Sequence, residues 1–213
     1  MTSSKAINER IMSLAEHDPW ELVYFLEEHR HGSFQSFGLV NLSTAVHRLG
    51  RTPVAESQAG RLLVTELGDL VGHRASPRDA RQVATVIGTF TRLRIRALGS
   101  LRSAVHRVCG QFNGQEAANV FWAIAKLELG GDEELGGWVR GAIGRVCGQF
   151  QAQHAANVFW AIAKLELGGD EELVGGVRGA IGRVCGQLPA QHAANVFWAI
   201  AKLELGVDEE IGR

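Results

Sequence analysis

Cysteine is scarce in this chain of 213 residues, and its placement excludes two kinds of site. The three cysteines, Cys109, Cys147 and Cys185, are evenly spaced and occupy one position of a repeated unit. Neighbouring helices of a stack lie about 10 Å apart, too far for a disulfide bond between equivalent positions. There is no Cys-x-x-Cys pair, and the histidines lack ligand spacing, which argues against a zinc site. We expect three small buried side chains in a reducing compartment.

Long apolar runs are also missing. Lys, Glu or Gly interrupts every candidate before the roughly 18 residues that a membrane span needs. The start of the chain contains no hydrophobic signal core and reaches an acid too early for a clear transit peptide. With 46% hydrophobic and 21% charged residues the composition is that of a globular domain, so we expect no membrane partner.

Charge is unevenly distributed along the chain. The formal net charge is −1, yet the segment from Arg74 to Arg107 holds eight arginines and one acid, Asp79. The sequence after this segment is mildly acidic.

The later part consists of three near-identical units, over residues 104–141, 142–179 and 180–213. A fixed period, here about 38 residues, is typical of stacked repeats, in which each unit buries its apolar face only against its neighbours. The last unit is shorter than the other two, so the chain ends inside its own period. This ending predicts a truncated sequence.

The earlier part contains two degenerate copies. Residues 1 to about 30 have helical spacing with a break at Asp18-Pro19, followed by weak repeats over 37–49 and 81–93. The alignment places Asn41 on Asn119. We therefore expect two regions, residues 1–103 with two degenerate repeats and residues 104–213 with three near-identical ones.

Each clean unit contains two helical patterns. The first, about residues 153–167, is apolar on nearly all sides, as expected of a helix between neighbours, and Gly168-Gly169 should end it. The second opens at Asp170 as N-cap. The sequence thus predicts an all-α fold, an α-solenoid or α/α superhelix of two-helix repeats. Five glycines inside the second helix of the first clean copy indicate either close backbone approach between helices or relaxed selection.

Four polar or aromatic positions of the first helix are spaced by four, three and four residues and share one face. Amides suit base edges, indoles suit stacking and cations suit phosphates, so this face is a candidate for binding single-stranded RNA. With their degenerate counterparts, the candidate residues are Asn41, Arg48, Arg92, Gln115, Asn119, Trp122, Lys126, Gln153, Asn157, Trp160, Lys164, Gln191, Asn195, Trp198 and Lys202.

Each position also has a structural explanation. A lysine in the last turn interacts favourably with the helix dipole, a tryptophan at helical spacing packs in a core, and an asparagine ties adjacent units together or caps a loop. The polar joint before each first helix varies between copies, which indicates either base choice or drift at an exposed loop. These specificity candidates are Asn113, Glu116, Gln151, His154, Pro189 and His192.

No catalytic constellation emerges, because His154 and His192 have no nucleophile at a fixed partner position. We expect a protein that is not an enzyme and that uses no metal or small-molecule cofactor.

The helix Gln-x-Ala-Ala-Asn-Val-Phe-Trp-Ala-Ile-Ala-Lys-Leu, repeated at this fixed period, closely resembles the octotricopeptide repeat family, which is related to the RAP-domain and FAST-kinase-like proteins. The resemblance is strong over residues 104–213 and fair over about 33–93. It implies a right-handed α-solenoid that binds RNA in a chloroplast or mitochondrion and acts in RNA processing, stability or translation as a post-transcriptional regulator. The Asn, Trp and Lys positions would then contact RNA.

Two hypotheses remain from the sequence. The first is a sequence-selective single-stranded RNA-binding protein, and the second is a protein–protein interaction scaffold of the same architecture. RNA binding that depends strongly on salt would favour the first hypothesis. Binding that is dominated by apolar contacts and does not change with salt would favour the second.

Overall fold

The computed structural model describes residues 3–203, and this part of the chain forms eleven α-helices and no strand. The prediction of an all-α fold is confirmed. The chain divides into two compact units, Met1–Val108 and Cys109–Arg213, where the sequence places a boundary between residues 103 and 104. The end of the incomplete last repeat, residues 204–213, lies outside the described residues.

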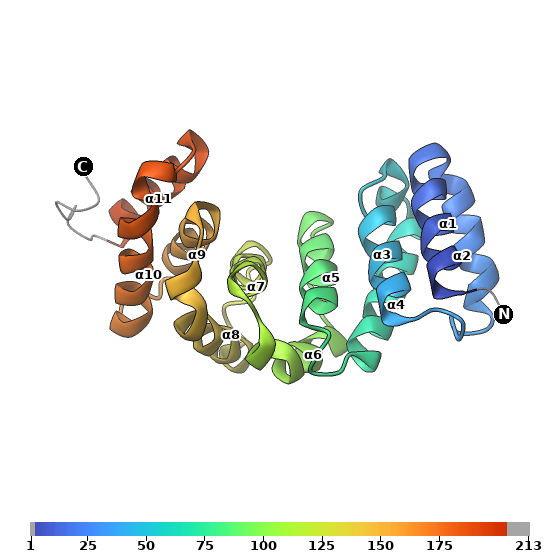
Figure 1. The fold of residues 1–213 in the computed structure, drawn as a ribbon, viewed down its shortest axis with the longest axis horizontal. Coiled ribbons are helices and arrows are strands. Elements are labelled where there is room, and N and C mark those ends of the chain that lie inside the picture. Colours follow the sequence, from blue (N-terminus) through green and yellow to red (C-terminus); the bar gives the residue numbers. More distant parts are fainter. Residues whose placement is uncertain (1–2, 204–213) are drawn as a thin grey trace. The chain divides into compact units, whose positions relative to one another are not determined.

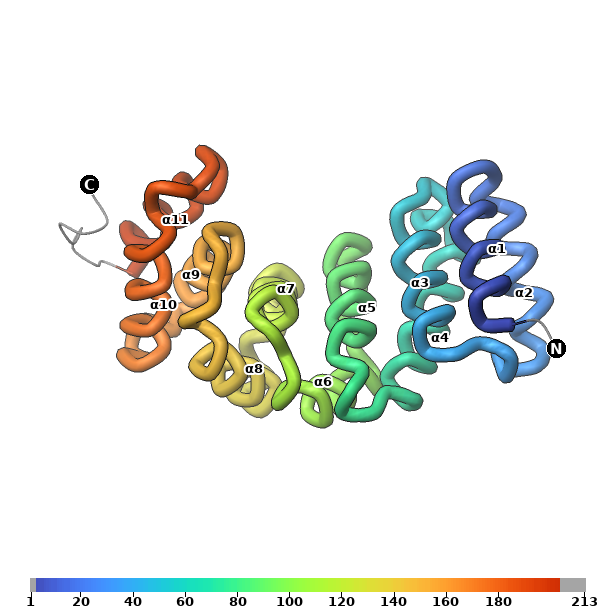
Figure 2. Tube along the Cα trace, viewed as in Figure 1, coloured from blue at the N-terminus to red at the C-terminus, as the bar shows by residue number. Residues whose placement is uncertain are grey.

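Unit 1 contains two rows of helices. The first row is α1, α3 and α5, the second is α2, α4 and α6, and successive members of each row pack together (Figure 2). The two rows also contact each other: α1 packs against α2, and α3 packs against α4. The elements are α1 (Ser4–His17), α2 (Pro19–Arg30), α3 (Leu39–Leu49), the 3-10 turn η1 (Pro53–Glu56), α4 (Gln58–Arg74), α5 (Ala80–Arg92) and α6 (Ser100–Val108).

The predicted break between the first two helices is confirmed. The Asp18 carboxylate accepts hydrogen bonds from the backbone N–H groups of Trp20 and Glu21, at 3.0 and 3.2 Å. Pro19 stands at the first position of α2, where no N–H is needed. Asp18 therefore ends α1 and caps α2.

Unit 2 has the same arrangement in a more regular form. Helices α7, α9 and α11 form one row and α8 and α10 form the other, and α7 packs against α8 as α9 packs against α10 (Figure 1). The elements are η2 (Cys109–Gln111), α7 (Gly114–Lys126), α8 (Glu133–Val146), η3 (Cys147–Gln149), α9 (Ala152–Lys164), α10 (Glu171–Val184), η4 (Cys185–Gln187) and α11 (Ala190–Lys202). Of the helices between residues 3 and 203, none is both long and apolar enough to cross a membrane.

The first helices lie between neighbours, as their apolar surface predicts. Phe121 of α7 and Phe159 of α9 are fully buried, whereas the equivalent Phe197 of α11 is 56% exposed. Helix α11 contacts α9 on one side. A stack of identical units therefore buries each phenylalanine only when a further helix covers it.

The helix starts agree with the sequence, and the helix ends do not. Asp132 and Asp170 cap α8 and α10 as predicted, because each carboxylate accepts from the N–H three residues on. The expectation that Gly168-Gly169 ends the first helix is wrong. Helix α9 ends at Lys164, and Glu166 takes a left-handed conformation with φ of 58°.

This helix end is a Schellman motif without glycine. The N–H of Leu167 donates to the carbonyl of Ile162, 3.0 Å away, and the N–H of Glu166 to that of Ala163. Glu128 repeats the arrangement after α7, with φ of 56°. A glutamate in the left-handed conformation is less stable by about 1–2 kcal/mol than one in the right-handed helical conformation. The local sequence does not predict this conformation.

The glycines of the second helix do not serve close packing, so that interpretation is wrong. A Cβ atom added at Gly137, Gly141, Gly144 or Gly148 would meet no atom within 4 Å. One added at Gly136 would meet only the tip of Arg140, at 3.3 Å. Gly137, Gly141 and Gly144 therefore lower the stability of α8 without a packing benefit, whereas Gly136 is buried and Gly148 lies in the turn η3, beyond the end of the helix.

The three cysteines form no disulfide bond, and they are half-buried rather than fully buried as predicted. Each begins the 3-10 turn that follows α6, α8 or α10. The tighter turn takes the side chain away from the buried stripe of the preceding helix.

Candidate functional site

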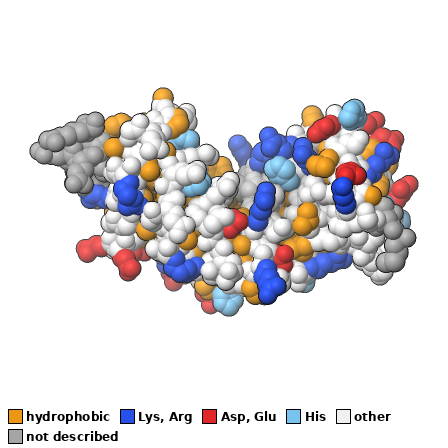
Figure 3. Space-filling view, viewed as in Figure 1, with side chains coloured by type: hydrophobic (Ala, Val, Ile, Leu, Met, Phe, Trp, Pro, Cys, Tyr) orange, Lys and Arg blue, Asp and Glu red, His pale blue; other side chains and the backbone are white. Residues whose placement is uncertain are grey.

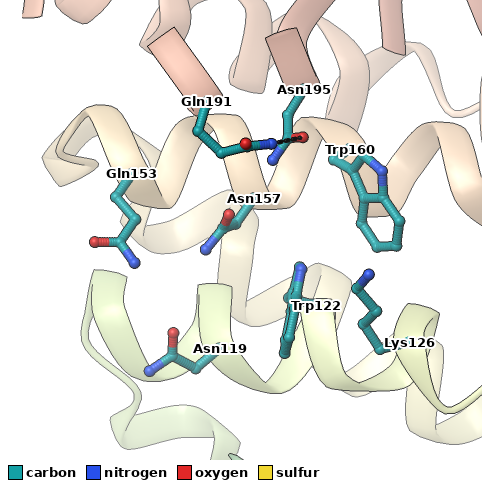
Figure 4. Close-up of a pocket in the computed structure, with 8 residues that line it drawn as sticks. All are labelled: Asn119, Trp122, Lys126, Gln153, Asn157, Trp160, Gln191 and Asn195. Carbon is teal, nitrogen blue, oxygen red and sulfur yellow. Dashed lines mark hydrogen bonds between the residues drawn. The ribbon is translucent and has the colours of Figure 1, made fainter. Parts of the chain in front are cut away.

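Helices α7, α9 and α11 together line a groove of about 390 Å³ in unit 2. Because the three helices lie in one row, equivalent residues come into line across the repeats (Figure 4). We call this surface the amide–tryptophan groove, and its lining residues are Asn119, Trp122, Lys126, Gln153, Asn157, Trp160, Gln191 and Asn195. The sequence predicted all eight as candidate binding residues.

The amides in the groove have unused hydrogen-bonding capacity. Asn119 and Asn157 are half-buried and Gln153 is exposed, and within residues 3–203 none of their side chains makes a hydrogen bond to protein. In α11 the Gln191 amide donates weakly to Asn195, at 3.5 Å. A half-buried amide without a partner offers a donor and an acceptor to a ligand.

The tryptophans form a second line beside the amides. Trp122 and Trp160 are half-buried, and Trp198 is 43% exposed. The rings of Trp160 and Trp198 have centroids 6.0 Å apart and planes tilted by 30°, which is within the range of aromatic pairs. These indoles therefore combine partial packing with accessible ring surface.

The three lysines of this face differ in their contacts. The Nζ of Lys126 lies 5.5 Å from the ring centroid of Trp122 and 4.6 Å from that of Trp160. Lys202 pairs with Glu166 at 3.2 Å. Lys164 is exposed, and the described part of the chain gives it no ion pair. One sequence position thus supplies a cation–π contact, a salt bridge and a free ammonium group.

Some predicted residues of unit 2 lie outside the groove lining. Gln115 is exposed at the start of α7, and Lys164, Trp198 and Lys202 lie on the same helix face beyond the lined part. Trp198 still reaches the site through its contact with Trp160.

Asn41 differs from the asparagines with which it aligns. Its side chain is fully buried, its Oδ1 accepts from Ser4 Oγ and the Gly38 N–H, and its Nδ2 donates to the Ser4 carbonyl. Helix α3 begins at Leu39, so Asn41 lies in its first turn, whereas Asn119 lies further inside α7. Asn41 ties α1 to α3 and has no group left for RNA, so its assignment to the binding face is corrected.

The cations of unit 1 form a separate basic cluster, defined here as His47, Arg48, Arg51 and Arg92. Burial lowers the pKa of His47, and the nearby charges of Arg51, Arg48 and Arg92 lower it further. Burial and then Arg51 also lower the pKa of Arg92. Figure 3 shows Lys and Arg side chains gathered over the region of α3 and α5. Arg48 is partly balanced by Glu16, 3.6 Å away.

None of the six specificity candidates is among the described residues that line the groove. Asn113 and Glu116 form a reciprocal capping box, with hydrogen bonds of 2.9 and 3.0 Å. Gln151 and Pro189 are exposed N-cap residues of α9 and α11. The variable joint therefore occupies helix starts rather than the surface where the amides converge.

The two histidines at these helix starts are half-buried. His154 Nδ1 lies 3.4 Å from the backbone N–H of Gln151, and burial lowers the pKa of this imidazole. The Nδ1 of His192 is buried without a hydrogen-bond partner. The His154 ring replaces the Glu116 half of the capping box, whereas His192 has no such partner because the N-cap residue of α11, Pro189, carries no N–H.

Within residues 3–203, no three His, Cys, Asp or Glu side chains lie close enough together to hold a metal ion. No protein-family model matches the chain, and no curated protein matches it.

Proposed function

We propose that the chain is an α-solenoid of two-helix repeats that binds single-stranded RNA selectively in the amide–tryptophan groove. The resemblance to the octotricopeptide repeat family motivates this proposal, and the row arrangement of first and second helices in both units supports it. The same resemblance places the protein in a chloroplast or mitochondrion, in RNA processing, stability or translation. Its role there is binding rather than catalysis.

The observation that carries the proposal is the convergence of unpartnered amides and partly exposed indoles on one groove. Asn119 and Asn157 keep their donors and acceptors free beside Trp122 and Trp160. Single-stranded RNA is bound by stacking unpaired bases on aromatic rings and by hydrogen bonds to their edges. A base stacked on an indole contributes about 1–3 kcal/mol to binding.

Phosphates would be held by the cations at the helix ends. Lys164 has no competing ion pair in the described structure, and Lys126 can exchange its ring contacts for a phosphate. Because only a few cations face the groove, we expect a salt dependence shallower than that of proteins with many phosphate contacts.

A protein scaffold is the second candidate, and one observation favours it. Phe197 is 56% exposed and Trp198 43% exposed on α11, a larger apolar surface than α7 or α9 leaves open. Exposed aromatic side chains are common anchors of protein interfaces. A partner bound there would depend on Phe197, whereas RNA bound in the groove would not.

Binding of the purified chain to a pool of labelled single-stranded RNAs at two salt concentrations tests the proposal. The main variant changes Lys126, Lys164 and Lys202 together to Ala. The matched control changes three exposed cations of unit 1, Lys5, Arg10 and Arg78, to Ala, so both variants lose the same net charge.

The proposal requires saturable binding that weakens with salt and weakens at least about tenfold in the groove variant, as expected for several lost phosphate contacts. The control variant should bind within about twofold of the unchanged chain. Absence of binding by a chain that circular dichroism shows to be helical would refute it, and so would equal losses in both variants.

A further inference from the structure

We infer that the three clean repeats recognise the same base three times, and that the preferred target is a single-stranded RNA tract of consecutive adenines. This inference rests on the proposed RNA-binding function and specifies its ligand.

The first step is the identity of the groove surface from repeat to repeat. Helices α9 and α11 have the same sequence throughout, and α7 departs from them only at Gly114 and Glu116. The asparagine position is therefore the same in all three units, and Asn119, Asn157 and Asn195 all line the groove. Repeat proteins of this kind contact about one base per repeat through two or three side chains. Identical side chains in three units predict three identical bases.

The second step is that the variable residues do not alter the groove. Glu116 is held in the capping box with Asn113, and His154 lies at the equivalent helix start near Gln151. None of these residues lines the groove. The differences between copies therefore change how each helix begins and leave an asparagine in the groove in each unit.

The third step is the chemistry of the amides. Asn119, Gln153 and Asn157 have no hydrogen-bond partner within the described residues, in contrast to Asn41, whose amide is fully bonded. An amide places one acceptor beside one donor, which matches a base edge with a donor beside an acceptor. Adenine offers such a pair on both its Watson–Crick edge (N6 and N1) and its Hoogsteen edge (N6 and N7).

The other bases match an amide less often. Guanine pairs a donor with an acceptor on its Watson–Crick edge (N1 and O6) but presents two acceptors on its Hoogsteen edge, and the pyrimidines offer such a pair on the Watson–Crick edge. Adenine can therefore satisfy the amide from either edge while its large ring stacks on an indole.

The tryptophan geometry leaves a place for a flat ring. Lys126 Nζ lies over the rings of both Trp122 and Trp160, so its ammonium marks a space bordered by two indoles (Figure 4). Lys126 is on the exposed end of α7 and can swing toward a phosphate. An adenine that enters this space would replace the cation–π contacts of Lys126 with stacking of its own ring on the indoles.

Fluorescence anisotropy with the full chain and labelled 12-mers of rA, rU and rC tests the inference. The test variant is Asn157→Leu, which keeps the side-chain shape and removes the amide. The control is Gln187→Leu, an exposed amide of the η4 turn that lies outside the groove lining and outside the candidate binding residues.

We expect rA12 to bind at least about tenfold more tightly than rU12 or rC12, since each bidentate base contact discriminates by about 1–3 kcal/mol. Asn157→Leu should remove most of this preference, and Gln187→Leu should retain it. Equal binding of the three RNAs would overturn the adenine inference while RNA binding stands. Equal weakening of all three RNAs by Asn157→Leu would overturn it as well. Failure of every RNA to bind would refute the proposed function itself.

Discussion

The ammonium of Lys126 lies 4.6 Å from the ring centroid of Trp160, a residue of the next repeat. This contact links α7 to α9 across the row of first helices, while Lys126 also lies over Trp122 of its own helix. It joins two of the three residue types that the sequence places on one face.

The cation–π contact predicts a difference between two lysines in almost identical surroundings. Lys126→Met should lower the free energy of unfolding by about 0.5–1 kcal/mol, because an exposed cation–π contact is worth about that much. Lys164→Met, at the equivalent position with no such contact found in the described structure, should change it by less. Urea unfolding followed by circular dichroism measures both. Equal effects would show that the ring contact contributes nothing.

The glycines of α8 predict stabilisation by alanine. Gly141→Ala and Gly144→Ala should each raise the free energy of unfolding by about 0.5–1 kcal/mol, since both lie inside a helix and the new methyl group meets no atom within 4 Å. Gly72→Ala is the opposite control, because its Cβ would lie 2.6 Å from the backbone of Ser100. Thermal and urea unfolding of the three variants compare them. Destabilisation by Gly141→Ala would contradict the open space around this helix.

The left-handed conformation of Glu166 predicts a further stabilising change. Glu166→Gly should raise the free energy of unfolding by about 1 kcal/mol, because glycine adopts φ of 58° without steric cost. Glu166→Gly also removes the exposed salt bridge with Lys202. That salt bridge contributes less to the free energy of unfolding than the change to glycine adds. Glu166→Ala keeps the unfavourable conformation and should give no gain. If Glu166→Ala raised the free energy of unfolding as much as Glu166→Gly, the effect would come from the removed charge and not from the backbone conformation.

His47 predicts a pH dependence of stability. Its pKa is lowered in the folded state by burial and by Arg51, Arg48 and Arg92, while the unfolded value is about 6.5. The unfolded chain therefore binds the proton first as pH falls. The stabilising contribution of the neutral imidazole is complete above about pH 6.5 and is lost as pH falls from there through the lower folded pKa.

The measurement is the free energy of unfolding from pH 8 to pH 5 for the unchanged chain and for His47→Gln. Other groups that titrate affect both proteins, so the difference between the two curves isolates His47. The difference should shrink as pH falls. A difference that stays constant would show that the folded protein does not resist protonation of this residue.

Much of the fold follows from the sequence, because periodic apolar residues and N-caps act locally. The helix break at Asp18 and the caps at Asp132 and Asp170 appear where they were predicted. The face shared by Asn157 and Trp160 also follows from their spacing, and the row packing of the helices brings that face into one groove.

The remaining features depend on tertiary contacts that spacing does not encode. Asn41 aligns with Asn119 in sequence, but α3 starts later, so the side chain turns to Ser4 of α1 and is buried. The left-handed Glu166 occupies a position where glycine is usual. Both outcomes depend on where a helix begins or ends within its packed neighbours.

Ultraviolet cross-linking of bound RNA, followed by mass spectrometry of tryptic peptides, tests the central claim most directly. Trypsin should release the three first helices within separate peptides, residues 108–126, 146–164 and 184–202, which differ in sequence before the shared helix. The proposal predicts cross-links in these peptides, at Trp122 and Trp160 of the groove above all. Cross-links confined to peptides of the basic cluster in unit 1, with none in the first helices of unit 2, would contradict it.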